Sequence, residues 1–380
     1  MKSMIQRHRD IQRMRESYAK QRRLHEFVEY MGSLFSDENV NLADFSVRHL
    51  FEALVDGGAE IVTLHFNNAH GGYRMLENDA VNTSLFANIM GQWIYNATLR
   101  AYQMPELIGD MLVTKIQSVE RTERIPGVKA IGDQVEIVDE GRPYPRAVTG
   151  ERWVETPPTI KRGLMVDITK EAIFFDKTGL ILQECSQVGK YIAINRERRI
   201  LDVVLGIATV YKRNGAAAVA TYGTQNTKSS NSLVDWTSID ASNQTFANMK
   251  DPDTGEPIVC SPNQVVVPPA LQVTAARIQN ATMTGVTNSS RETRVDGNSL
   301  QVPFNVLSNI YVKERTSSDT SWFHGSFQDG FVYAENWPLT VESDPSSQAA
   351  FDRDIVQRYK ASERGAAGVI EPLKACKNTP

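Results

Sequence analysis

The chain has 380 residues, of which 41% are hydrophobic and 23% charged, with a net charge of −4. A chain of this length can form two or three domains and bury a core without disulfides or metals. Its acidic balance excludes a nucleic-acid binder that works by overall charge, so any such contact has to come from a local basic patch.

Three cysteines (Cys185, Cys260 and Cys376) lie far apart and form no CxxC pair. This pattern argues against a zinc site or a disulfide framework and favours a reducing cytoplasm. The basic N-terminus is not followed by an apolar segment, so it is not a secretory signal. No apolar run reaches the roughly 18 residues of a membrane span, and we expect no membrane partner.

Residues 1–31 contain no proline and no glycine, and their weak apolar stripe predicts one amphipathic helix. Eight basic residues oppose two acidic ones up to His25, although the chain as a whole is acidic. One interpretation is a solvated helix face or an intersubunit salt-bridge partner. The other is a contact with DNA phosphates or an acidic scaffold, for which the candidates are Arg7, Arg9, Arg13, Arg15, Lys20, Arg22 and Arg23.

Further helices are predicted before residue 105. Asp44 is a candidate cap for a helix that ends at Leu54, and residues 61–64 resemble a short strand. Apolar residues at helical spacing predict a helix over residues 82–102, which Pro105 ends.

Residues 113–165 differ from the rest in being rich in charge, glycine and proline. Short β-rich pieces at residues 113–119, 134–138, 153–156 and 164–168 predict strands, but too few apolar residues are present to form a core. An ordinary surface loop of this length is unusual. We therefore expect a long projecting hairpin that lies on a neighbour.

The strongest helical pattern covers residues 178–205, with a charged interruption at Arg196, Glu197, Arg198 and Arg199. At a rise of 1.5 Å per residue the helix is about 40 Å long. Downstream, strands are predicted at residues 216–222, 265–267, 306–312, 331–333, 339–341 and 355–359. Residues 225–232 are expected to be flexible and residues 251–255 to form a turn. Helices are predicted at residues 240–250 and from Pro268-Pro269 through Ile278.

No pattern in the sequence indicates catalysis. The nucleophile elbow, the phosphate loops and the His-Glu-x-x-His zinc motif are absent, and Asp251 starts a calcium-like loop that has Pro262 where a glutamate is needed. We assign no catalytic, metal or cofactor-binding residue and expect no cofactor and no small-molecule substrate.

Three stretches carry a family resemblance. They are KRGLMVDITKEAIFFDKTG (residues 161–179), DPDTGEPI with VVVPPAL (residues 251–258 and 265–271) and SERGAAG (residues 362–368). Together with the order of elements they resemble the major capsid proteins of tailed double-stranded-DNA bacteriophages, over roughly residues 80–372. The resemblance implies an α+β fold with an N-arm, an extended-loop β-hairpin, a peripheral domain with a long spine helix, and an axial domain.

The domains expected from the resemblance divide the chain in five. Residues 1–60 form a basic helical N-terminal arm, 61–112 continue the arm with a helix, and 113–165 form the extended loop. Residues 166–213 and 304–380 form the peripheral domain, and 214–303 the axial domain.

The implied function is self-assembly into the pentamers and hexamers of an icosahedral shell that encloses phage DNA. Portal and scaffold proteins and non-specifically bound double-stranded DNA are the expected partners, and the location is the virion after assembly in the bacterial cytoplasm. The alternatives are an encapsulin-type compartment shell and, more distantly, a mixed α and β enzyme. Some relatives crosslink through an extended-loop lysine, but nothing near Lys129 identifies a partner and we expect no crosslink.

We expect the extended loop to lie over a neighbouring subunit and its charges to pair with the interruption in the long helix. The candidate intersubunit residues are Arg121, Arg124, Arg142, Arg146, Arg152, Arg196, Arg198 and Arg199.

Overall fold

The computed structural model describes residues 4–20, 23–37, 40–55, 80–103, 106–128, 137–138, 151–281, 283–287, 293–297, 304–344 and 355–380. It divides into two compact units, each made of three chain segments. Unit 1 comprises Met1–Met104, Lys161–Ala193 and Trp337–Glu363, and unit 2 comprises Pro105–Ile160, Ile194–Asn336 and Arg364–Pro380. Both units combine helices with sheet, as the predicted α+β class requires.

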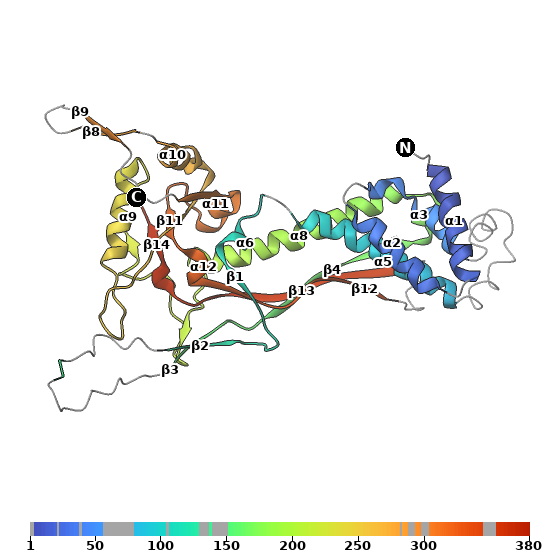
Figure 1. Ribbon diagram of the computed structural model, residues 1–380, viewed down its shortest axis with the longest axis horizontal. Coiled ribbons are helices and arrows are strands. Elements are labelled where there is room, and N and C mark those ends of the chain that lie inside the picture. Colours follow the sequence, from blue (N-terminus) through green and yellow to red (C-terminus); the bar gives the residue numbers. More distant parts are fainter. Residues whose placement is uncertain are drawn as a thin grey trace. The chain divides into compact units, whose positions relative to one another are not determined.

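Unit 1 is mainly helical (Figure 1). Its elements are α1 (Met4–Lys20), α2 (Leu24–Ser36), η1 (Leu42–Asp44), α3 (Val47–Leu54), α5 (Ala80–Tyr102), β4 (Ile160–Thr169) and α7 (Lys170–Phe174), with parts of α8 (Thr178–Val204), β12 (Phe331–Asp344) and β13 (Ile355–Val369).

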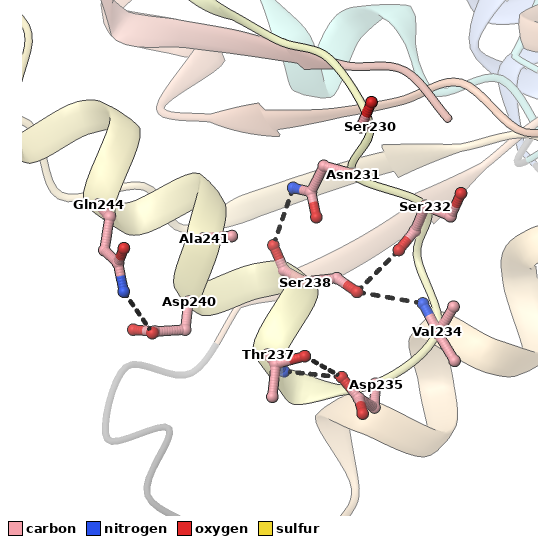
Figure 2. Close-up of a pocket in the computed structure, with 10 residues that line it drawn as sticks. All are labelled: Ser230, Asn231, Ser232, Val234, Asp235, Thr237, Ser238, Asp240, Ala241 and Gln244. Atoms are coloured by element: carbon pink, nitrogen blue, oxygen red, sulfur yellow. Dashed lines mark hydrogen bonds between the residues drawn. The ribbon is translucent and has the colours of Figure 1, made fainter.

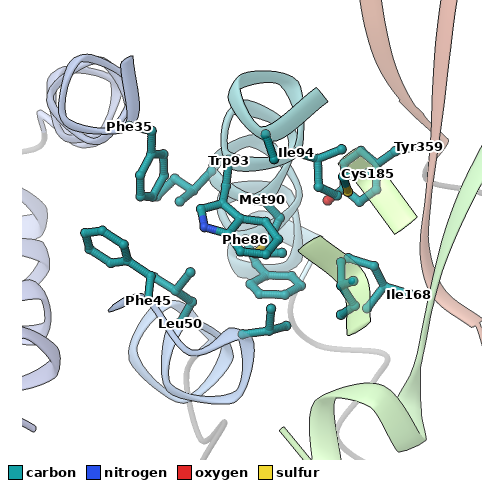
Figure 3. Packing of buried hydrophobic residues seen from close by; sticks show 14 of the residues in the cluster. Phe35, Phe45, Leu50, Phe86, Met90, Trp93, Ile94, Ile168, Cys185 and Tyr359 are labelled. Atoms are coloured by element: carbon teal, nitrogen blue, oxygen red, sulfur yellow. The ribbon is translucent and has the colours of Figure 1, made fainter. Parts of the chain in front are cut away.

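The core of unit 1 is arranged around α5 (Figure 3). Phe86 and Trp93 are fully buried, and the Trp93 indole donates to the Leu42 carbonyl at 3.3 Å. Cys185 of α8 and Tyr359 of β13 belong to the same core. The helix predicted for residues 82–102 is confirmed, because its apolar face is this buried face.

The single helix predicted for residues 1–31 is wrong. The chain forms α1 and α2, and Arg23 between them leaves helical geometry with φ −115° and ψ 37°. Phe27 and Met31 of α2 are fully buried, while α1 contributes Ile11 to the same core. Two shorter helices can bury both apolar faces in one core, which one straight helix of this length cannot do.

Hydrogen bonds from polar side chains that the sequence did not single out stabilise the ends of the N-terminal helices. Ser46, not Asp44, caps α3 by accepting from the His49 backbone N–H, which corrects the predicted cap. Arg100 donates to the carbonyls of Phe35, Asp37 and Val40 at 2.8–2.9 Å. A guanidinium satisfies carbonyls at the C-terminal end of α2 and complements its dipole there.

Unit 2 contains many short elements. They are α6 (Gly109–Leu112), β1 (Thr114–Gln117), β2 (Arg124–Val128), β3 (Glu151–Glu155), β5 (Lys212–Arg213), β6 (Thr227–Lys228), α9 (Trp236–Ala247), β7 (Gln264–Val267), α10 (Pro269–Gln279), β8 (Met283–Thr287), β9 (Thr293–Gly297), β10 (Asn305–Ser308), α11 (Ile310–Thr316), β11 (Trp322–Gly325), α12 (Phe327–Gly330), η2 (Pro372–Lys374) and β14 (Ala375–Asn378), with the remainder of α8, β12 and β13.

Four sheets are present in the described residues. The largest has the order β10-β7-β11-β14-β6, in which β7 runs parallel to β10 and antiparallel to β11. The others have the orders β1-β12-β13-β4, β2-β3-β5 and β8-β9. The strand predicted at residues 265–267 and the helix that follows it are confirmed as β7 and α10.

Two strand predictions in this region are wrong. Residues 216–222 form no strand beyond an isolated bridge between Tyr211 and Val219. The strand predicted over residues 306–312 ends at Ser308, because Asn309 accepts from the Tyr311 backbone N–H and begins α11. Residues 225–232, expected to be flexible, include β6, which pairs with β14.

The long helix predicted over residues 178–205 is confirmed as α8. It ends at Val204, and Gly206 follows with a φ of +69°, a left-handed conformation that glycine adopts without strain. The Asp202 carbonyl accepts from the N–H groups of Ile207 and Ala208 at 2.9 Å, so the last turn is closed.

The region predicted as one hairpin, residues 113–165, contains strands that belong to two different sheets. β2 and β3 pair antiparallel from Arg124 opposite Glu155 to Val128 opposite Glu151. β1, by contrast, runs parallel to β12, and β4 belongs to the same sheet. The hairpin within the described residues is therefore β2–β3, with β5 alongside β3. The strand predicted at residues 61–64 and most of that at 134–138 lie outside the described residues.

Candidate functional site

The three arginines of the charged segment in α8 have partners in their own chain. Arg196 is only 7% exposed, donates to Asp110 at 2.8 Å and lies 4.5 Å from the ring centroid of Tyr333. Arg199 donates to the Gly365 carbonyl at 3.2 Å.

Arg198 is more open than Arg196. Its guanidinium pairs with Glu314 at 3.0 Å and lies 5.2 Å from the Tyr311 ring centroid. The Arg198 side chain keeps 42% of its surface exposed, against 8% for Arg196. Arg198 can therefore be reached by another molecule, whereas Arg196 is part of the interior.

Glu197 is the most constrained charge of this segment, and the sequence did not single it out. Its carboxylate accepts from the backbone N–H groups of Ile108 and Gly109 at 3.0 and 2.8 Å. Asn309 donates to it at 3.3 Å. A Cβ at position 109 would lie 2.5 Å from the Glu197 oxygen, so glycine permits this close approach.

The environment of Glu197 affects its ionisation. Burial raises its pKa, and the two backbone N–H groups counter part of that effect by stabilising the carboxylate. The charged segment of α8 therefore ties α6 and the start of α11 to the helix. This is a structural role for residues that the sequence assigned to contacts between subunits.

The β2–β3 ribbon carries two arginines with different environments. Arg124 keeps 69% of its side chain exposed, pairs with Glu155 at 3.1 Å and lies 4.7 Å from the Trp153 ring centroid. The Arg152 side chain keeps only 13% of its surface exposed and lies between Asp251 at 3.4 Å and Glu371 at 2.8 Å. Arg152 therefore fastens the ribbon to its own unit, and Arg124 faces solvent.

The remaining candidates of the extended loop are less constrained. Arg121 is exposed, and its carbonyl accepts from the Thr159 N–H at 2.8 Å. Arg142 and Arg146 lie outside the described residues. Asp251 and Asp253, which resembled the start of a calcium loop, form a turn and pair with Arg152 and Arg213.

The basic N-terminal residues also differ from one another. Arg13 is exposed on α1, whereas Arg15 donates to the Ala53 carbonyl at 2.9 Å. Arg23 pairs with Glu26. The backbones of Arg7, Arg9 and Lys20 belong to α1, and Arg22 lies outside the described residues.

A shallow polar groove lies beside the first turns of α9 (Figure 2). Its polar groups bond to one another: Ser238 donates to the Ser232 carbonyl at 2.8 Å and accepts from the Val234 N–H. Asp235 caps α9 by accepting from Thr237. Among the lining residues there is no histidine, cysteine or lysine that could act as a nucleophile or a base, and we assign the groove no ligand.

The described part of the chain offers neither a cluster of metal ligands nor a helix that could span a membrane. No group of three or more histidine, cysteine, aspartate or glutamate residues there could hold a metal ion. No helix there combines the length and the apolar character that crossing a membrane requires.

A sequence model of a family described as phage capsid protein matches residues 154–378, which is more than half of the chain. No curated protein matches the sequence.

Among solved structures, the chain is similar to one from Gordonia phage Cozz, at 12% identity and a TM-score of 0.46, covering 72% of this chain and 87% of that one. A capsid structure of the cyanophage P-SCSP1u matches at 14% identity and a TM-score of 0.47, covering 71% and 86%. A virus-like particle from Pyrococcus furiosus matches at 11% identity and a TM-score of 0.42, covering 75% and 97%.

The assignment rests on the family model, which favours a phage protein over a compartment shell. It makes the chain a structural protein that associates with copies of itself and is located in the capsid of the virion. The chain belongs to the phage capsid protein family, and it is a major capsid protein with the tailed-phage capsid fold.

Proposed function

We propose that this capsid protein closes an icosahedral shell of pentamers and hexamers around phage double-stranded DNA, and that assembly takes place in the host cytoplasm. The observation that supports this proposal is the match of the phage capsid family over residues 154–378. In this proposal the chain has no enzymatic activity, and portal and scaffold proteins join the shell. The five domains expected from the sequence are proposed to have separate roles in this shell.

The extended loop is proposed to lie on a neighbouring subunit. Arg121 and Arg124 are exposed near the start of the β2–β3 ribbon, and the Arg198 side chain in the α8 segment keeps 42% of its surface exposed. We assign the contact between subunits to these residues. Exposed ion pairs contribute only about 0–1 kcal/mol each, which suits a shell that repeats each contact many times and corrects errors.

Electron microscopy of the purified chain tests the shell. Closed particles tens of nanometres across are expected, whereas a population of monomers or small oligomers under all assembly conditions would contradict the proposal.

A shortened variant tests the extended loop. Val128 and Glu151 lie opposite each other in the β2–β3 register, so residues 129–150 can be replaced by a two-residue Asn-Gly turn that keeps the ribbon intact. This variant is expected to fold and to remain soluble without forming closed shells. Normal shells from it would contradict the role of the loop. Arg124→Ala serves as the milder companion variant, because it removes one exposed charge and leaves the loop in place.

The basic residues of α1 are proposed to face the lumen and to contact DNA or an acidic scaffold. Arg13 is exposed and available for such a contact, whereas Arg15 is engaged with the Ala53 carbonyl. Each phosphate that a basic side chain neutralises adds roughly one unit to the salt slope of binding, so removal of that side chain lowers the slope by the same amount. Arg13→Gln is therefore expected to reduce the salt slope of DNA binding to purified shells. An unchanged slope, or exposure of α1 on the outer surface, would contradict this assignment.

A further inference from the structure

The turn that joins α7 to α8 in unit 1 presents an apolar surface that no assigned role explains. We define the α7–α8 corner as residues 174–180. Phe175 keeps 63% of its surface exposed and Leu180 keeps 49%. A large exposed aromatic side chain beside an exposed leucine forms the kind of apolar centre that anchors protein–protein interfaces.

The backbone of the corner is held by several independent bonds. The Phe175 N–H donates to the Glu171 carbonyl at 2.9 Å, and the Lys177 N–H donates to the Ala172 carbonyl at the same distance. Arg48 of α3 donates to the Phe174 carbonyl at 3.4 Å. The position of Phe175 is thus determined by α7 and α3 before any partner binds.

Asp176, next to Phe175, has a left-handed backbone with φ +48°. Few residues other than glycine adopt this conformation, and a surrounding structure has to hold it. Ser46 and Thr178 each donate to the Asp176 carboxylate at 2.7 Å, and the Val47 N–H donates to the Thr178 hydroxyl at 2.8 Å. Burial opposes ionisation of Asp176, but these hydrogen bonds outweigh it and lower the pKa of the carboxyl.

The Phe175 ring itself has limited freedom. The Phe174 ring meets it edge-on with centroids 4.9 Å apart, and the Lys177 ammonium lies 5.7 Å from its centroid. An aromatic side chain that is already fixed loses little conformational entropy on binding. A partner that covers Phe175 would therefore gain most of the free energy of burying its apolar surface.

We propose that the α7–α8 corner is an anchor of the contact between two copies of this chain, with Phe175 as its central side chain and Leu180 beside it. A second copy is the partner because the chain is a capsid subunit, which meets copies of itself in every shell. The charges around the ring agree with this choice. Glu171 and Lys177 are both exposed, so the surface carries both signs and can complement an identical or related surface.

The inference rests on the proposed function, since it requires that the chain forms shells. The test compares the lowest protein concentration at which closed particles form, measured by sedimentation and electron microscopy. Phe175→Ser is expected to raise this concentration at least about tenfold, the loss typical of a central anchor residue. Phe175→Tyr keeps the ring and is expected to assemble at a concentration near that of the wild type.

A matched control separates the corner from general surface hydrophobicity. Val273 on α10 is 70% exposed, and Val273→Ser is expected to leave assembly unchanged. An equal loss in both serine variants would overturn the assignment, and so would assembly of Phe175→Ser at the wild-type concentration. A large drop in the melting temperature of the unassembled Phe175→Ser subunit would also overturn it, because the ring would then be covered by its own chain.

Assembly of the wild type separates a failure of the proposed function from a failure of the inference about Phe175. Failure of the wild type to form particles would contradict the proposed function. Formation of particles by the wild type and by Phe175→Ser at the same lowest protein concentration would contradict the inference alone.

Discussion

The charged segment of α8 and the α7–α8 corner that precedes this helix use their side chains in opposite ways. Near the C-terminal end of α8, Arg196, Glu197 and Arg199 are charged, yet their partners lie within the same subunit. Phe175, which precedes the first turn of α8, is apolar and yet exposed, and the backbone around it is held by hydrogen bonds. A charged segment is therefore not by itself a contact surface, because buried charges require partners in their own chain.

The largest effect is expected from removing the carboxylate of Glu197. Glu197→Ala leaves the N–H groups of Ile108 and Gly109 and the amide of Asn309 without their acceptor, and should lower the free energy of unfolding by about 3 kcal/mol. Urea unfolding of the unassembled subunit measures this. Glu184→Ala, on the exposed face of α8, is the control and should change stability by less than about 0.5 kcal/mol. Equal losses of stability in the two variants would show that Glu197 is no more important to the fold than an exposed glutamate of the same helix.

A second effect concerns a buried group in unit 2. His324 is 1% exposed and contacts Ser242 at 3.1 Å, and burial lowers its pKa to about 3. On acidification the unfolded chain binds a proton near pH 6.5 before the folded chain does, so stability present above that pH is lost between pH 6.5 and about 3. At pH 5 the loss is about 2 kcal/mol. Unfolding titrations should show this slope in the wild type and a flatter slope in His324→Gln.

Arg100 provides an intermediate case, because it is exposed but bonded to three carbonyls at the end of α2. Arg100→Ala is expected to lower the free energy of unfolding by about 1–2 kcal/mol. Arg13→Ala is the matched control, since Arg13 is exposed on α1. Thermal unfolding of the two variants tests this expectation. Similar melting temperatures would show that the three hydrogen bonds of Arg100 contribute nothing to stability.

The smallest effect on stability is expected from Arg198, whose ion pair with Glu314 is about half exposed. Arg198→Ala should change the free energy of unfolding by less than about 1 kcal/mol. If Arg198 receives the extended loop of a neighbour, the variant should also assemble less well, and more salt should remove the difference. Assembly identical to the wild type at low salt would leave Arg198 with a role inside its own subunit alone.

The helix predictions that depended on the clearest periodic patterns are confirmed, because the apolar residues at helical spacing in α5 and α8 coincide with buried faces. The weaker stripe in residues 1–31 predicted one helix where the chain forms two. The strand predicted over residues 306–312 failed because the capping side chain of Asn309 outweighed the β propensity of its neighbours.

The candidate site was harder to predict. The partners of Arg196 and Glu197 lie near residue 110 and at Asn309, so no local pattern could indicate them. The same applies to Phe175. The sequence did not single it out, and its exposure follows from how α7, Asp176 and α3 turn the chain at this point.

Hydroxyl-radical footprinting of free subunits and assembled shells tests the central contrast most directly. Phe175 is expected to be oxidised readily in the free subunit and to be protected in the shell. Tyr333, which is 1% exposed beneath Arg196, should be protected in both states. Equal oxidation of Phe175 before and after assembly, or new protection of Tyr333 on assembly, would contradict the account.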